Sequence, residues 1–185
     1  GTQFMYYQLK NDNFFKENPD AEYIIYTFIY HHIRRLYNHQ LNPFINMFNI
    51  RYKLSKGDLV EIKPVYKPLY SSYFVKKILN IKELRQMKKE TIDFKLFNKI
   101  LEETVQITKE KYPNSKFIMV EFKDLSDKKE LPKREIKKLK EMGITVVKAS
   151  DIISDITDRK YWLDDNIHPS ELAWSLIIPE IASKI

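Results

Sequence analysis

The chain has 185 residues, of which 43% are hydrophobic, so it is long enough for one domain with a real core. It contains no cysteine, which excludes disulfides, zinc–thiolate sites and a thiol nucleophile. Its three glycines, Gly1, Gly57 and Gly143, form no dinucleotide-binding, Walker or G-x-S-x-G motif. Much of the formal net charge of +7 lies in residues 76–89 and 128–140, where acidic residues interleave with the lysines. These stretches are either an anion-binding patch or, as we favour, the solvated faces of helices.

No run of 18 apolar residues occurs, so no segment is predicted to span a membrane, and no signal peptide is visible. The cellular compartment therefore stays open. The first residues, Gly1-Thr2-Gln3-Phe4, are typical either of the interior of a longer chain or of an artificial start. We expect a single domain over residues 1–185 that is truncated at its amino terminus.

The first part of the chain predicts a helix and then a buried strand. Residues 3–16 favour a helix, and Asn18-Pro19-Asp20 predicts a turn. Residues 23–29 are β-branched or aromatic without alternation, which is typical of a strand buried on both faces in a parallel sheet. Residues 31–37 follow at the carboxyl end of that strand.

Residues 41–72 are punctuated by prolines and are predicted to be an irregular insertion. Within it, residues 50–54 and 59–62 flank Ser55-Lys56-Gly57-Asp58, a pattern that favours a small β-hairpin. A helix is predicted over residues 71–88.

The second half of the chain alternates between helical and extended patterns. The predicted elements are a helix at 91–111, a strand at 116–122, a helix at 132–142 capped by Gly143, a short strand at 144–147 and a helical turn at 150–157. Ser170 is the expected N-cap of a last helix with an apolar face of Leu172, Leu176, Ile177, Ile181 and Ile185. This order predicts an α/β fold, in which right-handed crossovers build a three-layer α/β/α parallel sheet.

The segment before the last helix carries the clearest chemical pattern. Asp165 precedes His168 by three residues on one loop. A carboxylate at that spacing can accept the imidazole Nδ1–H, which leaves Nε2 free to take a proton from a nucleophile. The alternative interpretation is that Asp165 caps a turn and that His168 is a surface residue.

Asp165-Asn166-Ile167-His168-Pro169-Ser170, followed by the terminal helix, resembles the last signature block of the SGNH (GDSL-type) hydrolase superfamily. The amino-terminal segments, Gly1-Thr2-Gln3 before a helix and the strand from Tyr23, are similar to the block around the oxyanion glycine. The resemblance implies a flavodoxin-like three-layer fold and a serine esterase, for instance an acetyl-esterase acting on a carbohydrate.

In that resemblance the catalytic residues are His168, as general base, and Asp165, which orients it. The oxyanion and substrate-binding positions fall on Gly1, His31, His32 and Arg34. Alternatively, His31 and His32 are polar residues at a strand end, and Arg34 pairs with an acidic residue such as Asp20 or Glu22. The family's Gly-Asp-Ser block is absent from these 185 residues, because Gly57-Asp58 is followed by Leu59, and no Asn occupies the positions of His31 and His32. We therefore expect the nucleophile to lie upstream.

Two rival functions stay open. The domain is alternatively a catalytically degenerate SGNH-like module for binding or assembly, or a basic anion-binding domain. The four histidines and scattered carboxylates show no metal-ligand spacing, so neither a metal nor an organic cofactor is predicted. The expected partner is a small-molecule or carbohydrate ester, with no clear nucleic-acid signature, and the oligomeric state is not predicted.

Overall fold

The computed structural model describes residues 2–11, 16–17, 20–37, 51–62, 94–123, 129–164 and 168–183, without the side chains of Arg34, Arg35, Tyr37 and Arg51. By its internal contacts the chain divides into two compact units. One unit comprises residues 1–17 and 33–107, and the other comprises residues 18–32 and 108–185. No helix in the described part of the chain is long and apolar enough to cross a membrane.

The second unit is built on a parallel sheet, as the sequence predicts. Its three strands are β1 (Tyr23–Ile29), β4 (Lys116–Phe122) and β5 (Thr145–Lys148), in the order β1-β4-β5. β1 pairs along its whole length with β4, and β4 pairs with β5. The central strand β4 is buried at six of its seven positions. The central strand is therefore buried on both faces. The prediction that residues 23–29 are buried on both faces was wrong for β1, because burial alternates along it and Tyr23 and Ile25 are 43% and 44% exposed. In the described sheet β1 pairs with β4 alone and is an edge strand.

The two faces of this sheet carry different side chains, because successive residues of a strand point to opposite sides. On one face, Ile29, Val120, Phe122 and Val147 belong to a single hydrophobic cluster with the last helix. The register places Phe28 opposite Glu121, and Glu121 opposite Lys148. These three residues therefore lie on the other face.

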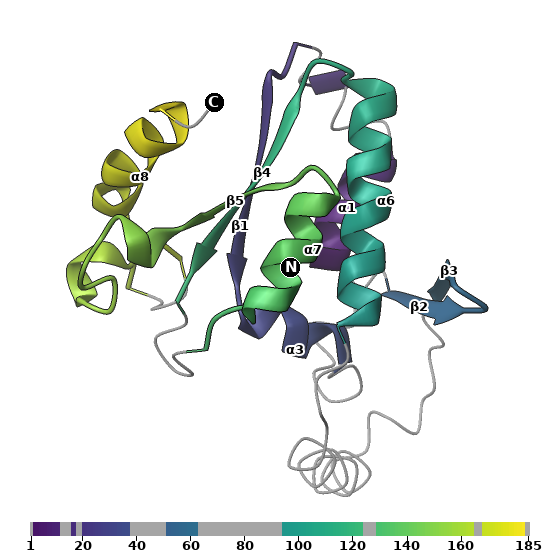
Figure 1. Cartoon of the computed structure of the whole chain (residues 1–185), viewed down its shortest axis with the longest axis horizontal. Helices are drawn as coiled ribbons and strands as arrows, with labels where there is room; N and C mark the ends of the chain where they lie inside the picture. The colour runs from purple at the N-terminus through teal and green to yellow at the C-terminus, as the bar shows by residue number, and fades with distance from the viewer. Residues whose placement is uncertain are drawn as a thin grey trace, which may run out of the picture. The chain divides into compact units, whose positions relative to one another are not determined.

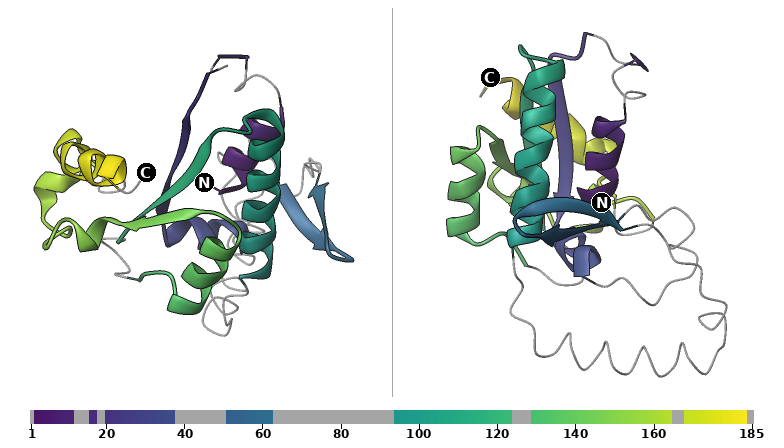
Figure 2. Two further views of the ribbon diagram at one scale, coloured as in Figure 1. Left: turned by 45° about the horizontal axis from the view of Figure 1, so that its top comes forward. Right: turned by 90° about the vertical axis from the view of Figure 1, so that its right-hand side faces the viewer.

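Helix α7 (Lys133–Glu141) connects β4 to β5. Its predicted end at Gly143 is confirmed, since Gly143 has a φ of 89° and Ile144 N donates to Leu139 O across the turn. Figures 1 and 2 show α7 and the last helix on opposite sides of the sheet. The β4–α7–β5 unit is a crossover between parallel strands, for which the right-handed sense is the rule.

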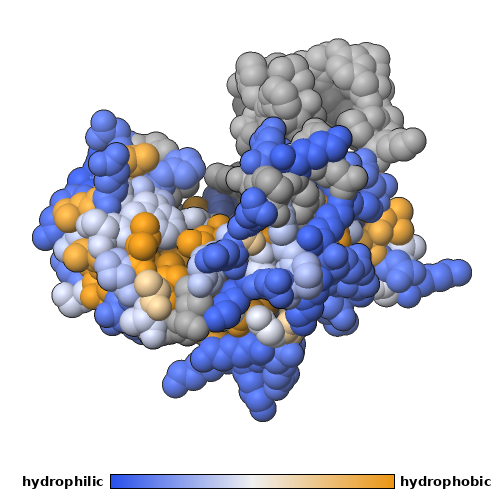
Figure 3. Space-filling view, turned by 90° about the horizontal axis from the view of Figure 1, so that it is seen from above, coloured by the Kyte–Doolittle hydropathy of each residue, from blue (hydrophilic) through white to orange (hydrophobic). Residues whose placement is uncertain are grey.

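The last helix, α8 (Glu171–Ser183), packs on the sheet through Ala173, Ile177 and Ile181. The prediction that Leu172 and Leu176 belong to the buried face was wrong, because they are 46% and 42% exposed. The small side chain of Ala173 lies at the contact instead, which turns both leucines outward. Figure 3 shows that one face of the molecule carries hydrophobic side chains at its surface among hydrophilic ones.

The first unit holds helix α1 (Thr2–Lys10), most of α6 (Lys95–Lys111) and the hairpin of β2 (Arg51–Ser55) and β3 (Asp58–Ile62). The predicted hairpin is confirmed. Its two turn residues have positive φ, 53° at Lys56 and 98° at Gly57, as a tight hairpin turn requires. Tyr52 packs edge-on against Tyr6 of α1 at 4.8 Å between ring centroids.

Several boundaries differ from the prediction. Helix α1 ends at Lys10 rather than at residue 16. Directly after this end, the side chain of Asn11 donates a hydrogen bond to Tyr7 O. Residues 31–37 form a helix, α3 (His31–Tyr37), which the sequence did not predict. The predicted helix over 71–88 and most of the irregular insertion lie outside the described residues.

Candidate functional site at the carboxyl end of the parallel sheet

A short loop with defined backbone bonds carries His168. Trp162 and Pro169 form an antiparallel bridge, and Leu163 N donates to His168 O at 2.8 Å. The segment before the loop, Trp162-Leu163, is therefore paired with the segment after it, His168-Pro169. Such a loop fixes the backbone from which His168 projects, and the His168 side chain is exposed.

Trp162 attaches this loop to the sheet. Its indole Nε1 donates to Ile156 O at 2.6 Å, and its ring lies edge-on to Phe122 with 5.9 Å between the centroids. Phe122 is the last residue of β4. The loop of His168 thus lies at the carboxyl end of the central strand, the edge of an open parallel sheet where binding sites concentrate.

Asp165, the expected partner of His168, lies outside the described residues. Its neighbour Asp164 is described, is fully exposed and pairs with Arg159 at 3.2 Å. Asp164 is therefore occupied by a surface ion pair and makes a matched control for Asp165.

His31 and His32 open helix α3 directly after β1 and its turn residue Tyr30. The ring of His32 stacks on Tyr26 at 5.9 Å and lies edge-on to Phe28 at 6.0 Å between centroids. A hydrogen bond of 3.0 Å joins Tyr26 Oη to His32 Nδ1. The ring of His32 therefore packs on the Phe28 face of the sheet, whereas Trp162 packs on the Phe122 face.

Of the predicted site residues, the structure describes the side chains of His31, His32 and His168. Ile29 pairs with Phe122 in the sheet register, so β1 ends before His31 beside the strand end on which Trp162 packs. Gly1 and the guanidinium of Arg34 lie outside the described residues. His31 and His32 are both half-buried.

Glu121, a buried carboxylate near the carboxyl end of the central strand, was not identified from the sequence. Glu121 is the penultimate residue of β4 and is only 3% exposed, and Lys148 lies beside it on β5. The available signal was the acidic residue inside the apolar run Lys116–Phe122. Buried carboxylates are rare unless paired, so this residue marks a second point of interest.

Within the described ranges, no three His, Asp or Glu side chains are grouped so that they could hold a metal ion. The sequence matches no protein-family model. It also has no significant match among curated proteins or solved structures.

Proposed function

We propose that this chain is an SGNH-like ester hydrolase domain of flavodoxin-like fold, in which His168 and Asp165 are two members of a serine triad. The observation that carries the proposal is the loop of His168, bridged at its base and attached by Trp162 to the carboxyl end of the central strand. The parallel order β1-β4-β5 and a terminal helix on one face are compatible with that fold.

In the proposed reaction, Asp165 accepts the Nδ1–H of His168, and His168 Nε2 removes the proton from a serine hydroxyl. The serine oxygen attacks the ester carbonyl, and the proton passes to the departing alcohol. A water molecule then hydrolyses the acyl–serine bond with His168 again acting as base. This reaction requires a serine nucleophile, and no Ser of these 185 residues follows a Gly-Asp pair.

The oxyanion donors in this proposal are the backbone N–H of Gly1 and the ring of His31, and Arg34 binds an anionic group of the substrate. The ring of His32 is held by Tyr26 and Phe28 on the other face of the sheet. The proposed substrate is an O-acyl ester of a small molecule or carbohydrate.

The test compares the 185-residue chain with the complete product of its gene, using p-nitrophenyl acetate and acetylated sugars. We expect turnover from the complete product, and a loss of roughly a thousandfold or more in kcat for His168→Ala and Asp165→Asn. Asp164→Asn, the adjacent surface carboxylate, is the control and should retain activity. Turnover that survives both His168→Ala and Asp165→Asn would rule the assignment out.

The second candidate is a degenerate SGNH-like module that binds without turnover. It is favoured by the packing of His32 against Tyr26 and Phe28 at a position where the family has an oxyanion amide. A complete gene product that binds acetylated sugars, measured by calorimetry, but hydrolyses none of them would support this candidate. Such a result would contradict the hydrolase.

A further inference from the structure

Glu121 is an ionisable group enclosed at the carboxyl end of the sheet. Its side chain is 2% exposed, and it lies on the face opposite the α8 cluster, between Phe28 and Lys148 in the register. Nothing in the proposed ester chemistry uses this residue. A charged group in such a position is costly unless its oxygens are well paired.

The contacts of Glu121 attach it to the segment that enters α7. Its Oε1 accepts a hydrogen bond from Leu131 N. Its Oε2 has no hydrogen-bond partner within the described residues and lies 3.9 Å from Lys148 Nζ. Lys148 Nζ is closer to Glu130 Oε2, at 2.9 Å, and Lys123 Nζ approaches Glu130 Oε1 at 3.7 Å.

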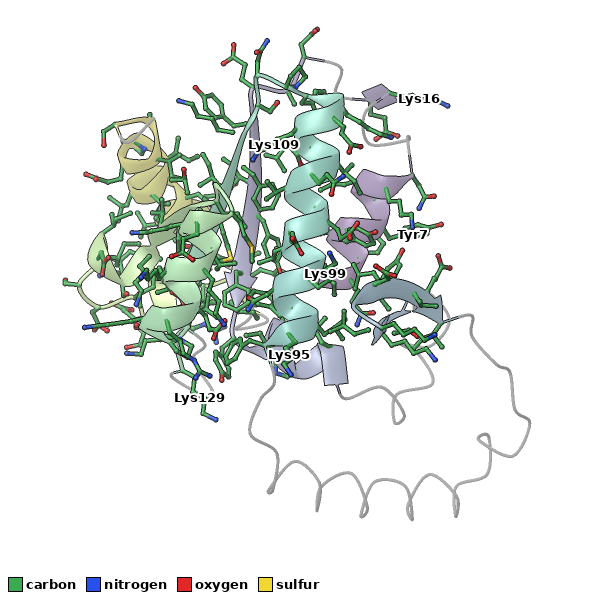
Figure 4. The ribbon with its side chains drawn as sticks, turned by 45° about the vertical axis from the view of Figure 1, so that its right-hand side comes forward. Tyr7, Lys16, Lys95, Lys99, Lys109 and Lys129 are labelled. Atoms are coloured by element: carbon green, nitrogen blue, oxygen red, sulfur yellow. The ribbon has the colours of Figure 1, made fainter. Side chains whose placement is uncertain are left out.

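We name the set Glu121, Glu130, Leu131 and Lys148 the Glu121 clamp. It attaches the segment before α7 to the carboxyl ends of β4 and β5. Leu131 immediately precedes Pro132 and the start of α7. Lys129, labelled in Figure 4, lies next to the clamp with its Nζ 5.8 Å from the centroid of the Tyr30 ring. The segment is thus held by Glu121 of β4, Lys148 of β5 and Tyr30, the residue that follows β1.

The charges around Glu121 oppose one another. Burial raises the pKa of the Glu121 carboxyl above its ordinary value, and the negative charges of Glu130 and Asp151 raise it further. The hydrogen bond from Leu131 N and the positive charge of Lys148 lower this pKa, but they do not cancel the effect of burial. For Lys148, burial lowers the pKa, but the hydrogen bond to Glu130 and the attraction of Glu121 outweigh it, so Lys148 stays charged. The pKa of Glu130 is lowered, chiefly by its hydrogen bond from Lys148.

We propose that the Glu121 clamp is a proton-operated latch, which seats residues 129–131 on the sheet when Glu121 is protonated and loosens them when it ionises. The reason is that an ionised carboxylate with one oxygen lacking a hydrogen bond gains water by leaving its enclosed position. The Leu131 N–H and Lys148 limit this gain but do not supply a donor for Oε2.

The direction follows from linkage. The pKa of Glu121 is raised in the seated state, while a water-exposed Glu121 in the loosened state titrates near its ordinary value of 4.5. Seating is therefore fully favoured below the ordinary pKa and is weakened as the pH rises through the raised pKa. Between those two values, the protection of the Leu131 amide falls by at most about tenfold per pH unit.

The test measures amide hydrogen exchange of Leu131 by NMR between pH 4.5 and pH 8, as protection factors relative to Val120 in the centre of β4. We expect Leu131 in the wild type to lose protection as the pH rises, and Glu121→Gln to keep it at every pH. Gln retains an oxygen for Leu131 N and carries no charge. Glu141→Gln, which removes an exposed carboxylate paired with Lys137 on α7, is the control and should titrate like the wild type.

Two further variants give signed shifts that a merely structural clamp would not produce. Lys148→Met removes the cation that favours ionised Glu121, so the midpoint of the Leu131 titration should move to higher pH. Glu130→Gln removes a repelling charge and releases Lys148, so the midpoint should move to lower pH. Leu131 protection that is independent of pH in the wild type, or that titrates equally in Glu121→Gln, would overturn the latch.

Discussion

At the scale of single residues, Trp162 determines whether the loop of His168 stays at the sheet. It is 5% exposed, it donates to Ile156 O and it packs against Phe122. The hydrogen bond satisfies a backbone carbonyl in a turn-rich segment between β5 and α8, and the ring contact joins that segment to the central strand. Tryptophan suits this position because one side chain supplies both a large apolar surface and a donor.

Trp162→Phe should therefore destabilise the protein more than its loss of volume alone implies. Phe keeps an aromatic ring beside Phe122 but leaves Ile156 O without its donor, at a cost of about 1–3 kcal/mol. For a chain of this length that corresponds to a fall in Tm of about 2–4 °C per kcal/mol. Thermal unfolding followed by circular dichroism measures it.

Trp174→Phe is the matched control, because Trp174 also lies edge-on to Phe122, at 5.5 Å, but is only partly buried. It should lower Tm less than Trp162→Phe does. Equal shifts for the two variants would mean that the Trp162–Ile156 hydrogen bond does not hold the segment.

At the scale of elements, the loop of His168 and helix α8 share one residue, Ser170. Its Oγ donates to Lys160 O at 2.8 Å and accepts from Ala173 N at 3.4 Å. Its backbone N donates to Tyr161 O at 2.9 Å. Ser170 therefore both caps the amino terminus of α8 and bonds the end of the loop to residues 160 and 161.

Ser170→Ala should cost about 1 kcal/mol of unfolding free energy, the usual effect of removing an N-cap side chain. Urea unfolding monitored by Trp fluorescence measures it. Ser175→Ala removes a hydroxyl from the exposed side of the same helix, where Oγ donates to Leu172 O, and should change stability by no more than about 0.5 kcal/mol. A Ser170→Ala variant as stable as Ser175→Ala would contradict the capping role.

The same elements show what the sequence can and cannot predict. The apolar runs of β1 and β4 and the glycine after α7 predicted their elements because local patterns alone determine them. The burial of α8 was predicted less well, since its apolar residues surround the helix and only packing decides that Ala173 faces the sheet. Glu121 was overlooked because its pairing with Leu131 and Lys148 joins segments 10 and 27 residues away.

At the scale of the whole molecule, the net charge of +7 raises the question of an anionic partner. In the described part of the predicted basic stretch, Lys138 contacts Glu135 at 3.2 Å and Lys137 contacts Glu141 at 3.8 Å. On α6, Lys99, labelled in Figure 4, contacts Glu102 at 3.0 Å. This interleaving favours solvated, locally balanced helix faces over a continuous phosphate-binding surface.

We therefore expect weak binding of the chain to polyanions. The affinity for duplex DNA or heparin, measured by fluorescence anisotropy, should be in the micromolar range or weaker at about 150 mM salt. The slope of log K against log salt should be no steeper than about −3, equivalent to roughly three phosphate contacts. The double variant Lys137→Gln/Lys138→Gln should leave that slope unchanged if the two lysines only form ion pairs within α7. A steep slope that this double variant reduces by about two would instead identify α7 as part of an anion-binding surface and would favour the basic-domain alternative over the esterase.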